Sequence, residues 1–124
     1  MLYITVMKIK VKLSIVNKKG ESFMGIGIVW LLRRIKSFGS IKKAAEDMSM
    51  SYAKAHRIIK RCEEELGVKM LVKTIGGNKR GGAVLTDFAE DFINKYDIYQ
   101  KCVKEFADRE FEKFKSDVST LMKT

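Results

Sequence analysis

In the last third of the sequence, apolar side chains recur at alternating intervals of three and four residues. This spacing is typical of a coiled-coil seam and predicts one long helix, from an N-cap at Thr86 to about Val118. We therefore treat residues 87–124 as a helical segment of its own. A chain of 124 residues has room for one small domain, which cannot cover such a seam. We predict a homodimer whose interface contains Phe92, Tyr96, Tyr99, Val103 and Phe106.

Three shorter helices are predicted before this segment. The first covers Ile26 to Ser37 and ends at Gly39, which can adopt the left-handed conformation that closes a helix. Ser40 is a suitable N-cap for a second helix that ends near Met48. The third helix runs from about Ser51 to Leu66. Its apolar side consists of Ala55, Ile58, Ile59, Cys62 and Leu66, and its opposite side of Ala53, Arg57 and Lys60.

Short strands are predicted on both sides of these helices. Apolar residues alternate with lysines from Met7 to Ile15, which indicates a strand, and Glu21 to Met24 can pair with it as a hairpin. Met70–Ile75 and Ala83–Thr86 are expected to form a second hairpin. Its connection, residues 76–82, is rich in glycine and contains Lys79 and Arg80, as expected of a wing that follows a phosphate backbone.

The predicted fold class follows from this order of elements. It is mainly α with a small β content, a winged helix-turn-helix with an N-terminal strand or hairpin and a long C-terminal dimerisation helix. Residues 1–86 are assigned to the winged helix-turn-helix, DNA-binding domain, and residues 87–124 to the dimerisation helix.

The charge of the chain is unevenly distributed. Its formal net charge is +10, and basic residues are concentrated between Arg33 and Arg61, whereas acidic residues outnumber basic ones between Asp87 and Lys115. A basic middle region indicates a surface that binds a polyanion. Charge alone leaves DNA, RNA, an anionic membrane surface and an acidic protein as open alternatives.

Several other classes of protein are disfavoured by the sequence. No apolar stretch is long enough to span a bilayer, and the lysine-rich N-terminus does not resemble a secretory signal, so we expect a cytoplasmic protein without membrane contact. Cys62 and Cys102 are far apart and are expected to be reduced and buried. The single histidine has no partner at ligand spacing, and residues 76–82 lack the P-loop pattern. We therefore predict no enzyme activity, no metal site and no cofactor.

The segment from Gly39 to Thr86 resembles the N-terminal DNA-binding domain of the ModE family of molybdate-responsive regulators, and more distantly the LysR-type regulators. The resemblance depends on four short patterns. They are GSI followed by an AA pair, MSY, LG before a strand of apolar residues and lysine, and two GG pairs that are separated by a basic spacer and followed by LT. The sequence departs from the family at Ala53, His56 and Cys62, which affects the operator sequence more than the fold. Family members usually carry molybdate-binding domains after this region, so molybdate sensing is not carried over, and no small-molecule effector can be identified.

A function follows from the motif and its resemblance. We expect a sequence-specific transcriptional regulator that binds double-stranded DNA as a homodimer, with the helix at about 51–66 in the major groove and residues 76–82 on the backbone. The alternatives are a stand-alone accessory module that dimerises with a full-length regulator, and a non-specific nucleic-acid-binding protein. The candidate DNA-binding residues are Ser40, Lys42, Lys43, Ser51, Tyr52, Lys54, His56, Arg57, Lys60, Lys79 and Arg80. For Tyr52, packing against the first helix remains an equal alternative.

Overall fold

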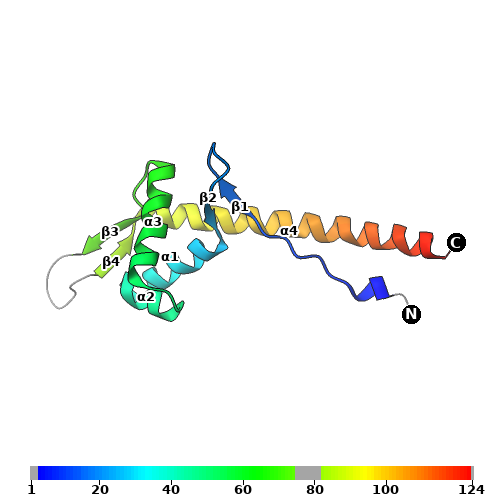
Figure 1. Cartoon of the computed structure of the whole chain (residues 1–124), viewed down its shortest axis with the longest axis horizontal. Coiled ribbons are helices and arrows are strands. Elements are labelled where there is room, and N and C mark those ends of the chain that lie inside the picture. The colour runs from blue at the N-terminus through cyan, green and yellow to red at the C-terminus, as the bar shows by residue number, and fades with distance from the viewer. Residues whose placement is uncertain (1–2, 75–81, 124) are drawn as a thin grey trace. The chain divides into compact units, whose positions relative to one another are not determined.

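The computed structural model describes residues 3–74 and 82–123 (Figure 1). In chain order the elements are the 3₁₀-helix η1 Tyr3–Val6, β1 Ser14–Val16, β2 Ser22–Gly25, α1 Ile26–Phe38, α2 Ile41–Asp47, α3 Tyr52–Leu66, β3 Leu71–Thr74, β4 Gly82–Leu85 and α4 Asp87–Met122. They divide into two compact units. We call Leu13–Asn94 the winged unit, and we call the described residues of 1–12 and 95–124 the tail unit.

The core of the winged unit forms where α1 packs against α2, α3, β2 and β4. Each helix contributes the apolar side that its periodicity predicts. Because Ala44 and Ala45 have small side chains, α2 can lie close to its neighbours. The buried helical residues are Val29, Leu31, Leu32, Ile35, Ile41, Ala44, Ala45, Ala55, Ile59, Cys62, Ala89 and Ile93, and Met24, Met70 and Ala83 complete this core.

Capping residues set the ends of the three short helices. Gly39 closes α1 in the left-handed conformation at φ 68°, and its N–H donates to the Ile35 carbonyl at 2.7 Å. The hydroxyl of Ser40 accepts the Lys43 N–H at 3.2 Å at the start of α2. The hydroxyl of Ser51 accepts the Lys54 N–H at 3.1 Å at the start of α3. The predicted bounds of α1, α2 and α3 are therefore confirmed to within a residue or two.

The N-terminal hairpin is shorter than predicted. β1 and β2 pair antiparallel, but the strand expected from Met7 to Ile15 exists only as Ser14–Val16. The reason lies in β2, which has four residues because α1 begins at Ile26, so it cannot pair with a longer strand. The alternation of lysines and apolar residues before Ser14 therefore lacks a partner strand, and that part of the prediction was wrong.

The second hairpin is the base of the wing. β3 and β4 pair antiparallel from Leu71 with Leu85 to Thr74 with Gly82. β4 is also attached to the turn between α1 and α2, since the Ala83 N–H donates to the Gly39 carbonyl at 3.0 Å. Thr86 caps α4 as predicted, because its hydroxyl accepts the Ala89 N–H at 3.1 Å. Residues 75–81, which include most of the predicted wing, lie outside the described residues.

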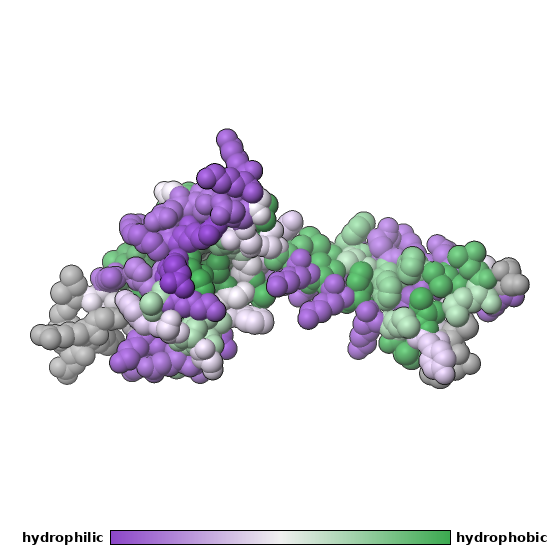
Figure 2. All heavy atoms as spheres, viewed as in Figure 1, coloured by the Kyte–Doolittle hydropathy of each residue, from purple (hydrophilic) through white to green (hydrophobic). Residues whose placement is uncertain are grey.

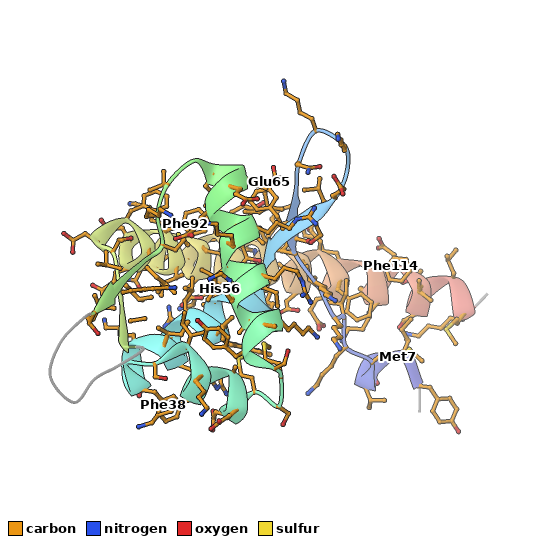
Figure 3. The ribbon with its side chains drawn as sticks, turned by 60° about the vertical axis from the view of Figure 1, so that its left-hand side comes forward. Met7, Phe38, His56, Glu65, Phe92 and Phe114 are labelled. Atoms are coloured by element: carbon orange, nitrogen blue, oxygen red, sulfur yellow. The ribbon has the colours of Figure 1, made fainter. Side chains whose placement is uncertain are left out.

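In the tail unit, the N-terminal segment is held against the last part of α4. The side chain of Lys115 is almost buried there. Its Nζ lies 2.7 Å from Oε1 of Glu112 and 3.3 Å from the carbonyl of Met7, and Figure 3 shows Met7 beside the part of α4 that carries Phe114. Residues 1–12 thus belong to the tail unit, whereas the sequence analysis grouped them with the winged helix-turn-helix. Helix α4 extends to Met122, beyond the predicted end near Val118.

Candidate nucleic-acid interface

Helix α3 has one buried side and one cationic side. Ala55, Ile59 and Cys62 are buried, while Lys54, Arg57 and Lys60 are exposed. Hydrophilic side chains cover much of the surface around this helix in Figure 2. The first turn of α3 contains no acidic residue. The helix therefore presents positive side chains together with the positive end of its dipole, and this combination attracts phosphate.

Tyr52 and His56 form a small aromatic surface near the start of α3. Their rings stack with centroids 5.9 Å apart and an interplanar angle of 25°. Tyr52 is 47% exposed, and His56 is half-buried in the middle of the helix (Figure 3). This exposure favours the DNA-facing alternative for Tyr52 over packing against α1. Stacked rings of this kind can contact a sugar, or a base edge, alongside the cationic residues.

Helix α2 adds two exposed lysines, Lys42 and Lys43. We call Lys42, Lys43, Lys54, Arg57 and Lys60 together the cationic residues. Two acidic residues follow them on α2: Glu46 is exposed, and Oδ2 of Asp47 accepts from Nε of Arg34 at 2.7 Å. Ser40 and Ser51 use their hydroxyl oxygens as caps, so each can contact DNA through its hydroxyl proton or backbone N–H. Lys79 and Arg80 lie outside the described residues.

Two lysines near this surface were missed by the sequence analysis. A pocket between α3 and β3 has a volume of about 470 Å³, and Lys69 and Lys73 line it together with His56 and Lys60. Both lie beyond the basic region from Arg33 to Arg61 that the sequence analysis describes. Their position beside α3 depends on where the chain turns back after Gly67, and helical or strand periodicity does not reveal that.

Glu63 connects α3 to the wing. Its Oε2 accepts the backbone N–H of Met70 at 2.7 Å and lies 3.4 Å from the N of Leu71. The backbone at the beginning of β3 thus has an acceptor on α3 itself. This link fixes the base of the wing relative to the cationic side of α3. The sequence shows only a run of three glutamates here, which gives no reason to single out Glu63.

The two cysteines differ in environment. Cys62 is buried in the core, and this burial, with a smaller contribution from the charge of Glu63, raises the pKa of its thiol to about 11. Cys102 is exposed on α4, so the prediction of two buried thiols was wrong for this residue. The seam register places Cys102 beside Val103, and the prediction failed because a long helix leaves most of its circumference to solvent.

The predicted interface residues of α4 are exposed to different degrees. Tyr99 and Phe106 are exposed, Phe92 and Val103 are half-buried, and Tyr96 is buried within the single chain. Ile98 and Phe114 are exposed as well and were not predicted. The ring of Phe92 also contacts that of Phe88, with centroids 5.5 Å apart. Helix α4 thus carries exposed apolar side chains beyond the predicted set.

In the part of the chain that the structure describes, no group of three or more histidine, cysteine, aspartate and glutamate side chains is placed to hold a metal ion. Within residues 3–74 and 82–123, no helix combines the length and hydropathy needed to cross a membrane.

The segment from the middle of α1 to the start of α4 is similar to a known family. Residues 31–90 match the family model of the bacterial regulatory helix-turn-helix proteins of the lysR family. This match includes α2, α3 and the hairpin of the wing. The LysR-type resemblance of the sequence is therefore confirmed for this domain.

A curated relative is the transcriptional regulator ModE of Haemophilus influenzae (strain ATCC 51907 / DSM 11121 / KW20 / Rd). It is 32% identical to this chain over 73 residues, which is 59% of this chain. The match covers 29% of that regulator, so the chain spans less than a third of its relative's length.

Solved structures show the same fold. The DNA-binding domain of CbnR, crystallised in a complex with DNA, aligns with a TM-score of 0.53 and 20% identity, and the match covers 70% of this chain and 94% of that one. Full-length CbnR, complexed with its target DNA, aligns with the same score and identity over 70% of this chain and 28% of its own. The predicted fold class, a winged helix-turn-helix with a long C-terminal helix, is confirmed.

Proposed function

We propose that this chain is a sequence-specific DNA-binding transcriptional regulator that acts in the cytoplasm. The observation that carries the proposal is the arrangement of α3, which buries Ala55, Ile59 and Cys62 and exposes Lys54, Arg57 and Lys60. In a helix-turn-helix, the corresponding helix lies in the major groove with its N-terminal residues at the base edges. The match of residues 31–90 to a family of regulatory helix-turn-helix proteins supports this assignment.

The cationic residues divide into two roles. Arg57 lies on the exposed side of α3 and can make a bidentate contact to guanine, which discriminates between bases by about 1–3 kcal/mol. Ser51, Tyr52, Lys54 and His56 are placed to read or flank the same bases. We assign phosphate contacts, which supply affinity and salt dependence, to Lys42, Lys43, Lys60, Lys79 and Arg80.

The regulator is proposed to act as a homodimer through α4, binding two half-sites related by the dimer axis. Tyr99 and Phe106 support this because both leave more than half of a large aromatic side chain exposed in the single chain. A second copy of the helix would cover such side chains at coiled-coil spacing. The proposed role does not include catalysis, a metal or a cofactor. The match to a family of regulatory helix-turn-helix proteins supports the absence of catalysis.

A pair of matched substitutions tests the assignment of roles. Arg57→Ala should reduce discrimination between the preferred DNA sequence and its variants. Lys60→Ala, one turn further along the same helix, should weaken binding to all sequences about equally and reduce the slope of log K against log salt by about 1. Lys18→Ala, in the exposed turn of the N-terminal hairpin, serves as the charge-matched control. Equal effects of Arg57→Ala and Lys60→Ala on discrimination would contradict the proposed roles.

A further inference from the structure

The winged unit contains a pocket whose described lining shares one residue, Lys54, with the proposed DNA-binding residues. Its volume is about 350 Å³, within the range of small-molecule sites in proteins. It lies between β2, α1, the turn from α2 to α3, and α3 itself. Most of its lining is apolar and comes from Met24, Ile28, Leu31, Met48, Met50 and Ile58. The pocket reaches the surface, since Gly27 and Lys54, which also line it, are exposed.

The charged groups of the pocket are all of one sign. Lys54 and Arg61 line it, and no acidic side chain does so among the residues that the structure describes. Nε of Arg61 is buried and has no hydrogen-bond partner among those residues. The other contact of this side chain is long, with Nη2 3.5 Å from Oε2 of Glu21. A buried donor without an acceptor is unfavourable, and a carboxylate is the acceptor that best matches the guanidinium group.

The apolar part of the lining can adapt to a ligand. Three of its side chains, Met24, Met48 and Met50, are methionines, which are flexible and fill irregular spaces. Beside them, Gly27 leaves room, because a Cβ built on it would meet no atom within 4 Å apart from its chain neighbours and the backbone of its own helix. The pocket thus combines an adaptable apolar wall with two cationic groups.

We propose that this pocket binds a small carboxylic acid with an apolar body. The carboxylate pairs with the guanidinium group of Arg61 and the ammonium group of Lys54. The aliphatic or aromatic part lies among the methionines and Ile28. This arrangement places the carboxylate against the accessible part of the guanidinium group, whose side chain is 43% exposed, and removes apolar surface of the ligand from water.

Such a ligand would act on DNA binding, and this part of the inference rests on the proposed function. The pocket is bounded by the turn that leads into α3 and by Lys54, one of the cationic residues. A bound carboxylate compensates the charge of Lys54 and adds a negative charge near the phosphates. We therefore expect the acid to weaken DNA binding.

Calorimetric titration of the full chain, without DNA, tests the pocket itself. The probes are hexanoate, octanoate, benzoate and 3-phenylpropanoate, with hexanol and benzyl alcohol as uncharged counterparts. At least one acid is expected to bind with one molecule per chain, and more tightly than its alcohol. If none of the four acids binds, or if the alcohols bind equally well, the proposal is overturned.

Substitutions inside and outside the pocket test where the acid binds. Arg61→Gln should weaken binding of the acid by about tenfold or more, because a hydrogen bond to a charged group is lost. Gly27→Leu should weaken it by filling the pocket without changing any charge, and it keeps the test decisive if Arg61→Gln does not fold. Lys18→Gln removes one positive charge outside the pocket and should bind as the unmodified chain does. Binding unchanged by both pocket variants would place the acid elsewhere and overturn the proposal.

A separate measurement distinguishes the two proposals. Duplex DNA binding is measured with and without the acid that binds. If the chain binds the acid but no DNA, the pocket stands and the proposed function fails. If it binds both and the acid leaves DNA affinity unchanged, the coupling through Lys54 is overturned.

Discussion

Removing the carboxylate of Glu63 should break the hydrogen bond that links the base of the wing to α3 and lower the free energy of unfolding. In the structure, Oε2 of Glu63 accepts the N–H of Met70 at 2.7 Å, while its 3.4 Å contact with Leu71 is too long to add much. A hydrogen bond to a charged group contributes about 1.5–3 kcal/mol, so we expect Glu63→Ala to cost about 2 kcal/mol of unfolding free energy. For a unit of this size, that corresponds to a decrease in Tm of about 8–16 °C.

The neighbouring glutamate provides the matched control for this measurement. Glu64 is exposed and stands at the same end of α3, so Glu64→Ala removes the same charge from the same helix dipole. Thermal unfolding followed by circular dichroism should show a large decrease for Glu63→Ala and little change for Glu64→Ala. Glu63→Gln, which keeps an acceptor without the charge, should fall between the two. Equal Tm values for the two alanine variants would refute the reasoning.

Three further predictions follow from the burial and backbone geometry of particular residues. A thiol reagent at neutral pH should modify Cys102 rapidly and Cys62 only on unfolding, because Cys62 is buried and the pKa of its thiol is raised to about 11. Since the folded state holds this proton more tightly than the unfolded state, the free energy of unfolding should fall as the pH rises from about 9 to 11. Cys62→Ala should remove that part of the fall. Phe106→Asp should shift the chain from dimer to monomer in sedimentation experiments with little change in secondary structure, whereas Lys104→Asp should not; a dimer that survives Phe106→Asp would contradict the proposed interface. Gly39→Ala should destabilise the chain by about 1–2 kcal/mol, because φ is 68° there, while Gly27→Ala should stabilise α1 by about 0.5–1 kcal/mol; unfolding in urea measures both, and changes of the same sign would contradict this account.

The sequence predicts the helices of the winged unit well because two independent signals coincide there. Apolar periodicity gives the extent of each helix, and the residues that can cap it give its ends, as Ser40, Ser51 and Gly39 show. The exposed side of α3 follows from the same periodicity. The cationic residues of the described interface were therefore available from the sequence.

Features that depend on tertiary partners were not available in this way. The alternation before Ser14 is a valid local strand signal, but a strand needs a neighbour, and β2 is too short to supply one. Glu63 looks like its two neighbours until the position of β3 is known. The same applies to Arg61, whose buried Nε becomes evident only once β2 and α1 are packed beside α3. Local patterns carry no information on these contacts.

The central claim, sequence-specific DNA binding through α3, is tested most directly by selection from a library of random duplex DNA. The purified chain is incubated with the library at moderate salt, and the bound molecules are sequenced. We expect enrichment of a motif with two-fold symmetry, as a homodimer with one recognition helix per half-site requires. Binding without any enriched motif would contradict sequence-specific regulation and indicate a non-specific nucleic-acid-binding protein.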